Sequence, residues 1–434
     1  MPSAGRRLQA CGPAAGPEGR CEGGFHVKPA AEIIARVKEH VDSLAPVLLD
    51  LSHRIHANPE TAYEERKAST WCADLLRSEG FEVTMPVAGL ETAFRARRGS
   101  GRPALAFLAE YDALPGVGHA CGHNIIAASA LGAGMALARA LEEAGVQATV
   151  LVDGTPAEET TSGKLVMVSA GLYREVDAVL SMHPEAEDAV GGSCLGVARL
   201  SFSFRGRAAH AASSPDKGVN ALDAAIQTFN NVNALRQHTR PDARIHGIIT
   251  HGGKAVNIVP DFARCEFGVR SVDLGYLREL LEKVKNCARA AALATGAGLD
   301  IEETPICEPI KENHTLTRLT LEAMTEVGRR ADDRTGKHFS ASTDFGNVSQ
   351  VVPAIAPMVK AAPEGTVLHH PDFAAAAASP QGDAAVVAAA KVMAIVGLRL
   401  VLEPETLRKA WADLTGGAPA AAGASRPEAG AGRL

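Results

Sequence analysis

Three short apolar runs, each followed by polar side chains, constrain the fold of this chain most strongly. The runs are residues 104–109, 149–152 and 177–181. Short apolar runs of this kind are typical of strands that are buried on both faces. Since a helical pattern at residues 125–145 lies between the first two runs, we predict an α/β sheet with helices packed on it.

The polar clusters after these runs carry side chains that bind metals. Cys121 and His123 lie in the loop after the first run, Glu158 and Glu159 follow the second, and His183 follows the third. Sites in open α/β sheets collect at the carboxyl ends of the strands, so we expect these clusters to lie together. A thiolate, imidazoles and carboxylates are the ligands that a zinc-like ion selects. The sequence therefore predicts a metallohydrolase.

The adjacent carboxylates receive different roles, because both cannot easily bind the same ion. We assign Glu159 as a metal ligand and Glu158 as the general base that takes a proton from water. The alternative for this pair is a solvated acidic turn. Asp112 is expected to orient a ligand histidine, or else to form a turn ahead of Pro115.

A fifth ligand is expected from the pair His369-His370 near the end of the chain. His369 is the first choice and His370 is its rival. With Cys121, His123, Glu159 and His183, one of them completes five ligands, which is enough for two ions. Taken singly, Cys121 could be a buried free cysteine beside His123 as a capping histidine, and His183 and His369 could be ordinary histidines.

The pattern changes near Gly196, where an α+β unit is predicted. Residues 197–204 alternate like a strand, 221–236 read as a helix, 245–250 and 264–269 as strands, 274–294 as a helix and 299–302 as a last strand. This β-α-β-β-α-β order predicts a ferredoxin-like unit inserted into a larger domain. The expected division is 29–195 and 308–415 for the larger domain and 196–307 for the insert. The Gly- and Pro-rich segments 1–28 and 416–434 are expected to be disordered.

The insert carries three further candidate residues. His210 follows small residues at the end of a strand and could donate to a developing oxyanion, or could be an ordinary surface histidine. Asn257 and Arg270 would suit a substrate carboxylate, which arginine binds through two parallel hydrogen bonds. Otherwise Arg270 is a plain surface charge.

Composition excludes several other classes of protein. A net charge of −6 and 4% aromatic residues argue against a nucleic-acid partner. The eight cysteines are dispersed and form no CxxC pair, which predicts reduced thiols and a cytoplasmic location. No run approaches the eighteen or so apolar residues that a membrane helix needs, and no membrane association is expected. The N-terminus lacks the apolar core of a secretory signal.

Other catalytic templates are absent from the sequence. There is no HExxH, no Gly-x-Ser-x-Gly and no GxGxxG after a strand. Ser162-Gly163-Lys164 resembles the end of a phosphate-binding loop, but the first glycine is missing at the required distance. Nucleotide chemistry is therefore not indicated.

At this point the motifs resemble those of a known superfamily. The chain is similar to the aminoacylase and carboxypeptidase superfamily of di-metal amidohydrolases, in its cysteine-containing branch. The segments that carry the resemblance are 110–116, 118–124, 154–159, 210–213, 218–225 and 342–349, and they lie within residues 30 to 410. The Cys-Gly-His-Asn, Pro-Ala-Glu-Glu and Ser-Thr-Asp-Phe-Gly-Asn-Val-Ser segments are together highly specific.

The resemblance implies a fold, a cofactor and a substrate class. It implies a phosphorylase/hydrolase-like α/β catalytic domain with two divalent metal ions, zinc in the first place and manganese or cobalt as alternatives. The insert would be a lid and dimerisation domain, with His210 reaching the active site of the partner subunit in a homodimer. The implied substrates are dipeptides with a basic C-terminal residue, such as β-alanyl-lysine.

The chain also departs from the pattern of this superfamily. Relatives carry a glutamate near the position of Ala375, so a carboxylate behind the last histidine ligand is missing here. No acidic residue that would bind the basic side chain of the substrate can be named from the sequence. Two alternatives stay open: an amidohydrolase acting on N-acyl amino acids, and a non-catalytic peptide-binding protein that kept the fold.

Overall fold

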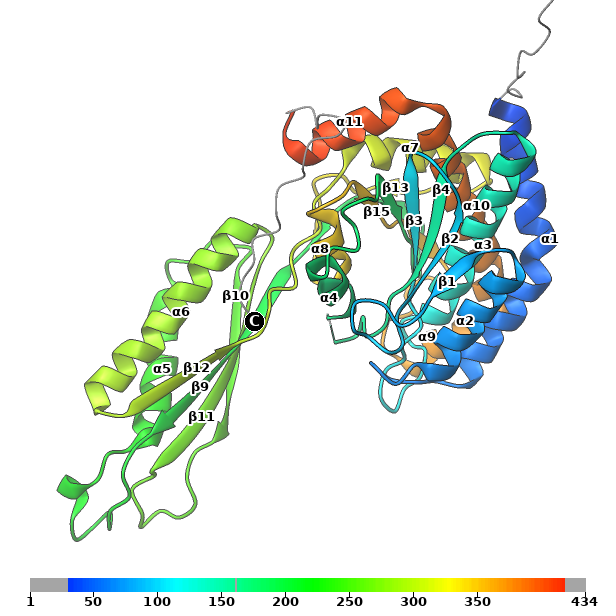
Figure 1. The fold of residues 1–434 in the computed structure, drawn as a ribbon. Coiled ribbons are helices and arrows are strands. Elements are labelled where there is room, and N and C mark those ends of the chain that lie inside the picture. The colour runs from blue at the N-terminus through cyan, green and yellow to red at the C-terminus, as the bar shows by residue number, and fades with distance from the viewer. Residues whose placement is uncertain (1–29, 161, 418–434) are drawn as a thin grey trace, which may run out of the picture.

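The computed structural model describes residues 30–160 and 162–417 of this chain. Within them the chain forms two units, one built on a six-stranded sheet and one on a four-stranded sheet, and the second projects away from the first (Figure 1). The predictions of disorder for residues 1–28 and for the tail beyond residue 417 lie outside the described residues.

The first unit takes up both ends of the described chain. Its N-terminal elements are α1 (Ala30–Ala57), α2 (Arg66–Ser78), β1 (Glu82–Thr84), β2 (Phe94–Gly99), β3 (Ala104–Ala109), α3 (His123–Glu143), β4 (Thr149–Gly154), α4 (Gly163–Ser169), β5 (Ala178–Leu180), β6 (His183–Glu185), β7 (Ala189–Val190) and β8 (Ser193–Cys194). Its C-terminal elements are α7 (His314–Glu326), β13 (Asp332–Asp333), β14 (His338–Phe339), α8 (Phe345–Ser349), β15 (Ala354–Ile355), β16 (Met358–Lys360), α9 (Pro371–Ala376), α10 (Pro380–Leu402) and α11 (Pro404–Thr415).

The six-stranded sheet has the order β1-β2-β4-β3-β5-β15. β4, β3, β5 and β15 run parallel, while β1 and β2 form an antiparallel edge. All residues of β3 and β4 are buried, as the continuous apolar runs predicted. Because these strands are parallel neighbours, their carboxyl ends meet at one edge of the sheet.

Helices cover both faces of this sheet, and side chains alternate between them. Leu105 and Phe107 of β3 pack in the core with α1, α3 and α10, whereas Ala106 and Leu108 pack with residues of α4 and α8. The alternation follows from the two-residue period of a strand. Small residues let α3 approach closely: a Cβ on Gly134 would lie 2.4 Å from Cγ2 of Val152.

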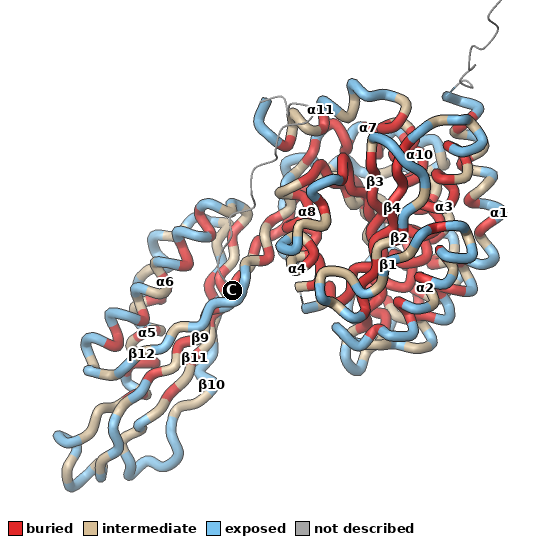
Figure 2. Tube along the Cα trace, viewed as in Figure 1, coloured by how far each residue is buried: buried red, intermediate tan, exposed pale blue. Residues whose placement is uncertain are grey.

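Two helices of this unit are unusually apolar. By length and composition alone, α3 and α10 are apolar enough to cross a membrane, although neither is an uninterrupted apolar run. Their most apolar windows are 94% and 72% buried within the fold. Figure 2 shows both among the buried parts of the trace. Core helices of globular domains have this character, because they are covered on nearly every side.

The second unit lies between β8 and α7 in the chain. Its elements are β9 (Gly196–Arg205), the 3₁₀ turn η1 (Pro215–Lys217), α5 (Ala221–Arg236), β10 (Arg244–His251), β11 (Phe262–Ser271), α6 (Leu274–Thr295) and β12 (Gly298–Glu303). The strands form an antiparallel sheet of order β10-β11-β9-β12. Alternate residues of β9 and β11 pack on α5 and α6, so the helices cover one face of the sheet. These elements follow the predicted β-α-β-β-α-β order.

The two units are joined at one end of the four-stranded sheet. The incoming segment at Val197 pairs with the outgoing segment at Cys307 through two backbone hydrogen bonds of 2.8 and 2.9 Å. β9 continues for ten residues away from this joint. At about 3.3 Å per residue, its far end lies about 30 Å from the joint. We call the second unit the lid, and its far end the lid tip.

Candidate metal centre and active site

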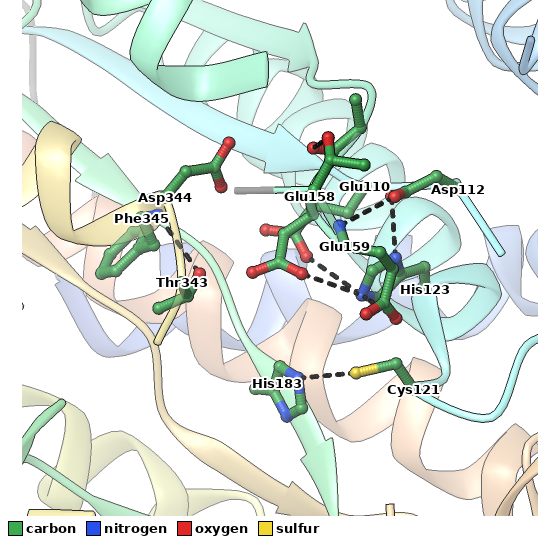
Figure 3. A network of polar contacts seen from close by, with 12 residues as sticks. Glu110, Asp112, Cys121, His123, Glu158, Glu159, His183, Thr343, Asp344 and Phe345 are labelled. Atoms are coloured by element: carbon green, nitrogen blue, oxygen red, sulfur yellow. Dashed lines mark hydrogen bonds and ion pairs between the residues drawn. The ribbon is translucent and has the colours of Figure 1, made fainter. Parts of the chain in front are cut away.

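The candidate site lies at the carboxyl edge of the six-stranded sheet. Glu110 and Asp112 follow β3, Glu158 follows β4, and His183 opens β6 shortly after β5. Figure 3 shows these side chains converging with those of Cys121, His123 and Glu159. The parallel order of β4, β3 and β5 brings the three loops together. This is the edge where ligands bind in open α/β sheets.

A glycine turn directs Cys121 and His123 toward the same point. Gly122 has φ of 72° and precedes α3, which starts at His123. A Cβ at this position would lie 2.5 Å from Cγ of Pro184 and 3.3 Å from a ring atom of Phe373. Glycine is therefore required both for the left-handed backbone and for the space. We expected α3 to begin at Ile125, two residues later than it does.

Three groups of side chains have donor atoms close enough to hold a cation. They are Cys121, His123 and His183; Cys121, Glu159 and His369; and Glu110, His123 and Glu158. Within each group the donor atoms lie within 4.8 Å of one another. The first two groups share Cys121 and together contain all five residues predicted as ligands. We refer to these five as the ligand cluster.

Asp112 connects two members of the ligand cluster. His123 Nδ1 lies 2.9 Å from its Oδ1, and the backbone N–H of Glu159 donates to its Oδ2 at 3.0 Å. Because Nδ1 donates to a carboxylate, Nε2 is the nitrogen of His123 that is left to bind a cation. The orienting role expected for Asp112 stays a prediction, for which these two contacts are the geometric basis.

Two buried atoms of the ligand cluster lack hydrogen-bond partners, which fits a bound cation. Within residues 30–160 and 162–417, Nε2 of His123 and Oε1 of Glu159 are buried without a hydrogen-bond partner. They lie 3.8 Å apart. Buried polar atoms are rarely left without a partner, and each such case calls for an explanation. A bound cation would satisfy both atoms at once.

The charges in the ligand cluster also favour a bound cation. Burial alone would raise the pKa of the Cys121 thiol, yet His183 and His123 hold that pKa well below its ordinary value. Burial raises the pKa of Glu159 to about 7. Burial and the neighbouring Glu110 raise the pKa of Glu158 well above its ordinary value. A thiolate and crowded buried carboxylates are the charges that a divalent cation compensates.

The structure separates the two histidines at the end of the cluster. Nε2 of His369 lies 3.5 Å from Oε2 of Glu159, and the backbone of His369 adopts φ of 63°. Nδ1 of His370 instead accepts a hydrogen bond from the backbone N–H of Asp372 and caps α9. His369 is therefore the histidine that faces the ligand cluster. Ala375, where a glutamate was expected from relatives, is an exposed residue of α9.

A buried ion network beside Glu158 was not predicted from the sequence. Lys164 Nζ lies 2.5 Å from Oδ1 of Asp344 and 2.9 Å from Oε1 of Glu110. Among the residues that the structure describes, Lys164 is the only buried lysine or arginine. Of its two partners, Glu110 lies in the loop after β3, and Asp344 lies at the start of α8, 180 residues from Lys164 along the chain. The available signal was weak: charged residues within otherwise apolar segments.

The three candidate residues of the lid lie at its two opposite ends. His210 and Asn257 are exposed at the lid tip, where Ile258 pairs with His210 and Ala211 N–H donates to the carbonyl of Asn257 at 3.0 Å. Arg270 is at the opposite end of β11, next to the joint. Its Nη1 donates to Oγ of Ser342 at 3.2 Å.

Asn257 and Arg270 of one chain lie too far apart to hold the same substrate carboxylate, and the role expected for the two residues stays a prediction. β11 spans the lid between them, so about 30 Å of strand separates the two side chains. Arg270 is within reach of the catalytic unit of its own chain through Ser342. His210 and Asn257 lie beyond the opposite end of β11, at the lid tip.

A buried set of thiol, imidazole and carboxylate donors at the carboxyl edge of an α/β sheet, with a further carboxylate beside it, defines a metal-dependent hydrolase. The chain belongs to the peptidase family M20/M25/M40, whose family model matches residues 106–394. The resemblance drawn from the motifs is confirmed, and so is the expectation of an enzyme of the peptidase and amidohydrolase class.

Relatives at the sequence level cover most of this chain. It is 38% identical over 392 residues to the Xaa-Arg dipeptidase of Mus musculus, covering 86% of this chain and 90% of that protein. It is 35% identical to the Xaa-Arg dipeptidase of Homo sapiens, covering 86% of this chain and 89% of that protein. These similarities place the chain among dipeptidases and amidohydrolases of the family.

Solved structures share the fold. A putative aminohydrolase from methicillin-resistant Staphylococcus aureus superposes with a TM-score of 0.72 at 20% identity, covering 85% of this chain and 99% of that one. A dinuclear metal-binding peptidase of the M20 family from Bacillus subtilis gives 0.65 at 21% identity, covering 83% and 99%. The predicted fold class, an α/β catalytic domain with an inserted α+β unit, is confirmed.

Proposed function

We propose that this protein hydrolyses dipeptides whose C-terminal residue is basic, such as β-alanyl-lysine or Xaa-Arg. The observation that carries the hydrolytic part is the ligand cluster with Glu158 beside it, in which the donor atoms of each group lie within 4.8 Å. The substrate class is supported by the similarity to two proteins named Xaa-Arg dipeptidase over 86% of this chain.

The ligand cluster would hold two divalent cations. We propose zinc, because a thiolate and imidazoles favour it, with manganese or cobalt able to replace it. When bound, such cations polarise a carbonyl and lower the pKa of water. The Bacillus subtilis protein with the same fold is described as a dinuclear metal-binding peptidase, which supports the number of two.

Glu158 would act as general acid and base. Its side chain is buried, and its Oε2 lies 3.8 Å from Nε2 of His123, which places it next to the ligand cluster. Its carboxylate would take a proton from the attacking water and return it to the leaving amine. The raised pKa of Glu158, caused first by burial, favours the protonated form that this second transfer needs.

His210 would act on the active site of a partner subunit. The backbone N–H groups of Ala212 and Ser213 both donate to its Nδ1 at 3.2 Å, which leaves Nε2 as the N–H donor. The side chain is exposed at the lid tip, with Asn257 next to it. We propose that Nε2–H donates to the oxyanion of the partner's substrate, a role worth about 3 kcal/mol. Asn257 would then meet the substrate carboxylate that Arg270 of the other chain binds.

A dimer through the lid is supported by its unequal sheet edges. β12 carries Asp300, Glu302 and Glu303, charges of the kind that protect an edge strand from pairing. β10 instead exposes Ile248 and Ile249, with exposed fractions of 64% and 41%. We propose that β10 faces its counterpart in a homodimer.

A dipeptide panel tests the substrate class. Purified protein would be assayed on β-alanyl-lysine, an Xaa-Arg dipeptide, the same dipeptides with a C-terminal leucine, and an N-acetyl amino acid, with and without chelator. The proposal predicts a preference for the basic dipeptides and loss of turnover on chelation. A preference for the N-acetyl amino acid would instead support a deacylase.

Subunit exchange tests the shared active site. Glu158→Gln and His210→Ala subunits are each expected to be inactive, and mixing them should produce hybrid dimers in which one site has both groups. The expected recovery is up to about one quarter of the parental activity, since half the dimers are hybrids with one intact site each. A mixture that stays inactive after proven exchange contradicts catalysis across subunits.

The alternative function is hydrolysis of N-acyl amino acids. An N-acetyl-L-cysteine deacetylase of Bacillus subtilis and a p-aminobenzoyl-glutamate hydrolase chain of Escherichia coli are 28% and 33% identical to this chain over shorter stretches. A non-catalytic peptide-binding protein is disfavoured, because the five ligand positions and Glu158 all carry functional side chains. Stoichiometric metal in the purified protein would argue further against such a relic.

We also propose a cytoplasmic location. The six cysteines in the described part of the chain are free thiols, and a reducing compartment preserves them. Fractionation of cells that express the tagged protein checks this, and recovery in a membrane or secreted fraction contradicts it.

A further inference from the structure

Lys164 is a buried cation whose presence neither the fold nor the proposed chemistry explains. Its side chain is fully buried at the start of α4, a few residues beyond the loop that carries Glu158 and Glu159. Both its backbone N–H and its Nζ donate to Asp344, at 2.7 and 2.5 Å. Burying an ion pair seldom stabilises a fold more than apolar side chains of the same volume would. Stability of the fold therefore does not account for a charge at this position.

The third candidate cation group lies directly beside this lysine. Glu110, His123 and Glu158 are all buried, with donor atoms within 4.8 Å of one another. The two carboxylates lie 3.7 and 3.8 Å from Nε2 of His123. A cation in this group would bind the carboxylate that must be free to move protons. The ligand cluster therefore has a competing site built from its own general base.

Lys164 occupies one member of this competing group. Its Nζ lies 2.9 Å from Oε1 of Glu110, while Oε2 of Glu110 is the oxygen nearer His123. An ammonium group in contact with a carboxylate repels a divalent cation and uses one of the two oxygens that the cation would need. Asp344 holds the ammonium in place from the other side.

We propose that Lys164 is a built-in cation that keeps metal off Glu110 and Glu158, so that Glu158 stays free to act as general base. Lys164 is thus a positioning residue: it acts through Glu110 and touches neither substrate nor metal. The proposal rests on amide hydrolysis with Glu158 as base, but not on which dipeptide is cleaved.

Burial and charge around Lys164 support this assignment. Burial alone would lower the pKa of Lys164, but Asp344, Glu110 and Glu158 raise it well above its ordinary value, so the side chain is an ammonium ion. The carboxylates of Glu110 and Glu158 repel each other, and this repulsion adds to burial in raising the pKa of Glu158. Lys164, in contact with Glu110, supplies a positive charge at this pair of carboxylates that cannot exchange with solvent.

The test replaces the ammonium and counts bound metal. Lys164→Met keeps the length of the side chain, and Lys164→Met with Asp344→Asn also removes one of the carboxylates left unpaired, so that folding is preserved if the single variant fails to fold. Each would be stripped with chelator, titrated with Zn²⁺ or Mn²⁺, and analysed for metal per folded chain. The kcat and KM are then measured on any amide that the parent cleaves.

The proposal predicts about one more bound cation per chain than the parent, held by the carboxylates of Glu110 and Glu158 while Nε2 of His123 stays with the ligand cluster. The kcat should fall about 100-fold with KM little changed, because a general base is worth about that factor. Adding Glu110→Gln should remove the extra cation, since it takes one ligand from the competing group. Asp153→Asn is the matched control: Asp153 is a buried carboxylate paired with Arg95 at 2.7 and 2.6 Å, outside the ligand cluster. It should lower stability without changing bound metal or kcat.

Two results would overturn the proposal. One is a folded Lys164 variant with the parental number of cations. The other is a variant whose KM rises while kcat per folded chain is unchanged, which a structural role in substrate binding would produce. Both results are judged by comparing the variant with the parent, so they do not depend on which dipeptide the parent cleaves. A parent without bound metal would instead overturn the proposed metal centre.

Discussion

Replacing Asp112 by asparagine tests how the ligand cluster is held together. Asp112 is 1% exposed, and its two oxygens accept from His123 Nδ1 at 2.9 Å and from the backbone N–H of Glu159 at 3.0 Å. Asparagine offers one accepting oxygen and one NH₂ group. One of the two ligands therefore faces a donor instead of an acceptor, while the volume of the side chain is unchanged.

The magnitude follows from the bond that is lost. A hydrogen bond to a charged group contributes about 1.5–3 kcal/mol. Carboxylates that orient metal ligands typically affect metal affinity by about 10- to 100-fold when mutated, which corresponds to about 1.4–2.7 kcal/mol. The two estimates agree, so we expect Asp112→Asn to weaken binding of the first cation by about 10- to 100-fold.

Competition with a fluorescent chelator at constant pH measures this effect on metal-free protein. The control is again Asp153→Asn, which removes a buried carboxylate that pairs with Arg95 and belongs to none of the three candidate cation groups, and it should leave affinity unchanged. If Asp112→Asn binds Zn²⁺ within about threefold of the parent, then His123 and Glu159 are not oriented through Asp112, and the reasoning is refuted.

Three further predictions concern the same site. Gly122→Ala should lower the free energy of unfolding by about 2–5 kcal/mol, from about 1–2 for alanine at φ of 72° and about 1–3 for the contact with Pro184; denaturant unfolding that shows less than about 1 kcal/mol contradicts the geometry of this turn. In metal-free protein, burial raises the pKa of Glu159 from 4.5 to about 7. The contribution of Glu159 to stability is therefore present below about pH 4.5 and is lost as pH rises through about 7. The parent should lose more stability over that range than Glu159→Gln, and equal pH profiles would disprove the raised pKa. His369→Ala should lower metal affinity and kcat by at least about 10-fold, whereas His370→Ala should change only stability, by about 1 kcal/mol for a lost helix cap; the reverse result would make His370 the ligand.

Much of this site was accessible from the sequence because its residues lie at the ends of apolar runs. A strand that is buried on both faces shows as a continuous apolar segment, and β3 was predicted with its observed bounds, Ala104–Ala109. The polar residues that follow such strands must lie at the carboxyl edge of the sheet. Cys121, His123 and Glu159 could therefore be grouped without any coordinates.

The choice between neighbouring histidines could not be made from the sequence, because it depends on backbone conformation. His369 lies in the left-handed region, and His370 caps α9 in an extended conformation. Nothing in the pair Leu368-His369-His370-Pro371 predicts which residue takes which conformation. Proline at the first position of α9 indicates only that a helix begins there.

The network of Lys164 was hidden for a different reason. Its partner Asp344 is 180 residues away, and the two meet only because α4 and α8 cover the same face of the sheet. In the sequence, Ser162-Gly163-Lys164 was merely a failed match to a phosphate loop. The separation of Asn257 from Arg270 was equally hidden, since it depends on the direction and length of β11.

The central claim is that residues distant in the chain form a cage for two cations, with Glu158 left free beside it. Anomalous diffraction from crystals soaked in Zn²⁺ or Mn²⁺ tests this most directly. We predict two peaks about 3.5–4 Å apart, with Cys121 in contact with both and Glu158 in contact with neither. A single peak between Glu110, His123 and Glu158, or no peak at this edge of the sheet, would contradict the account.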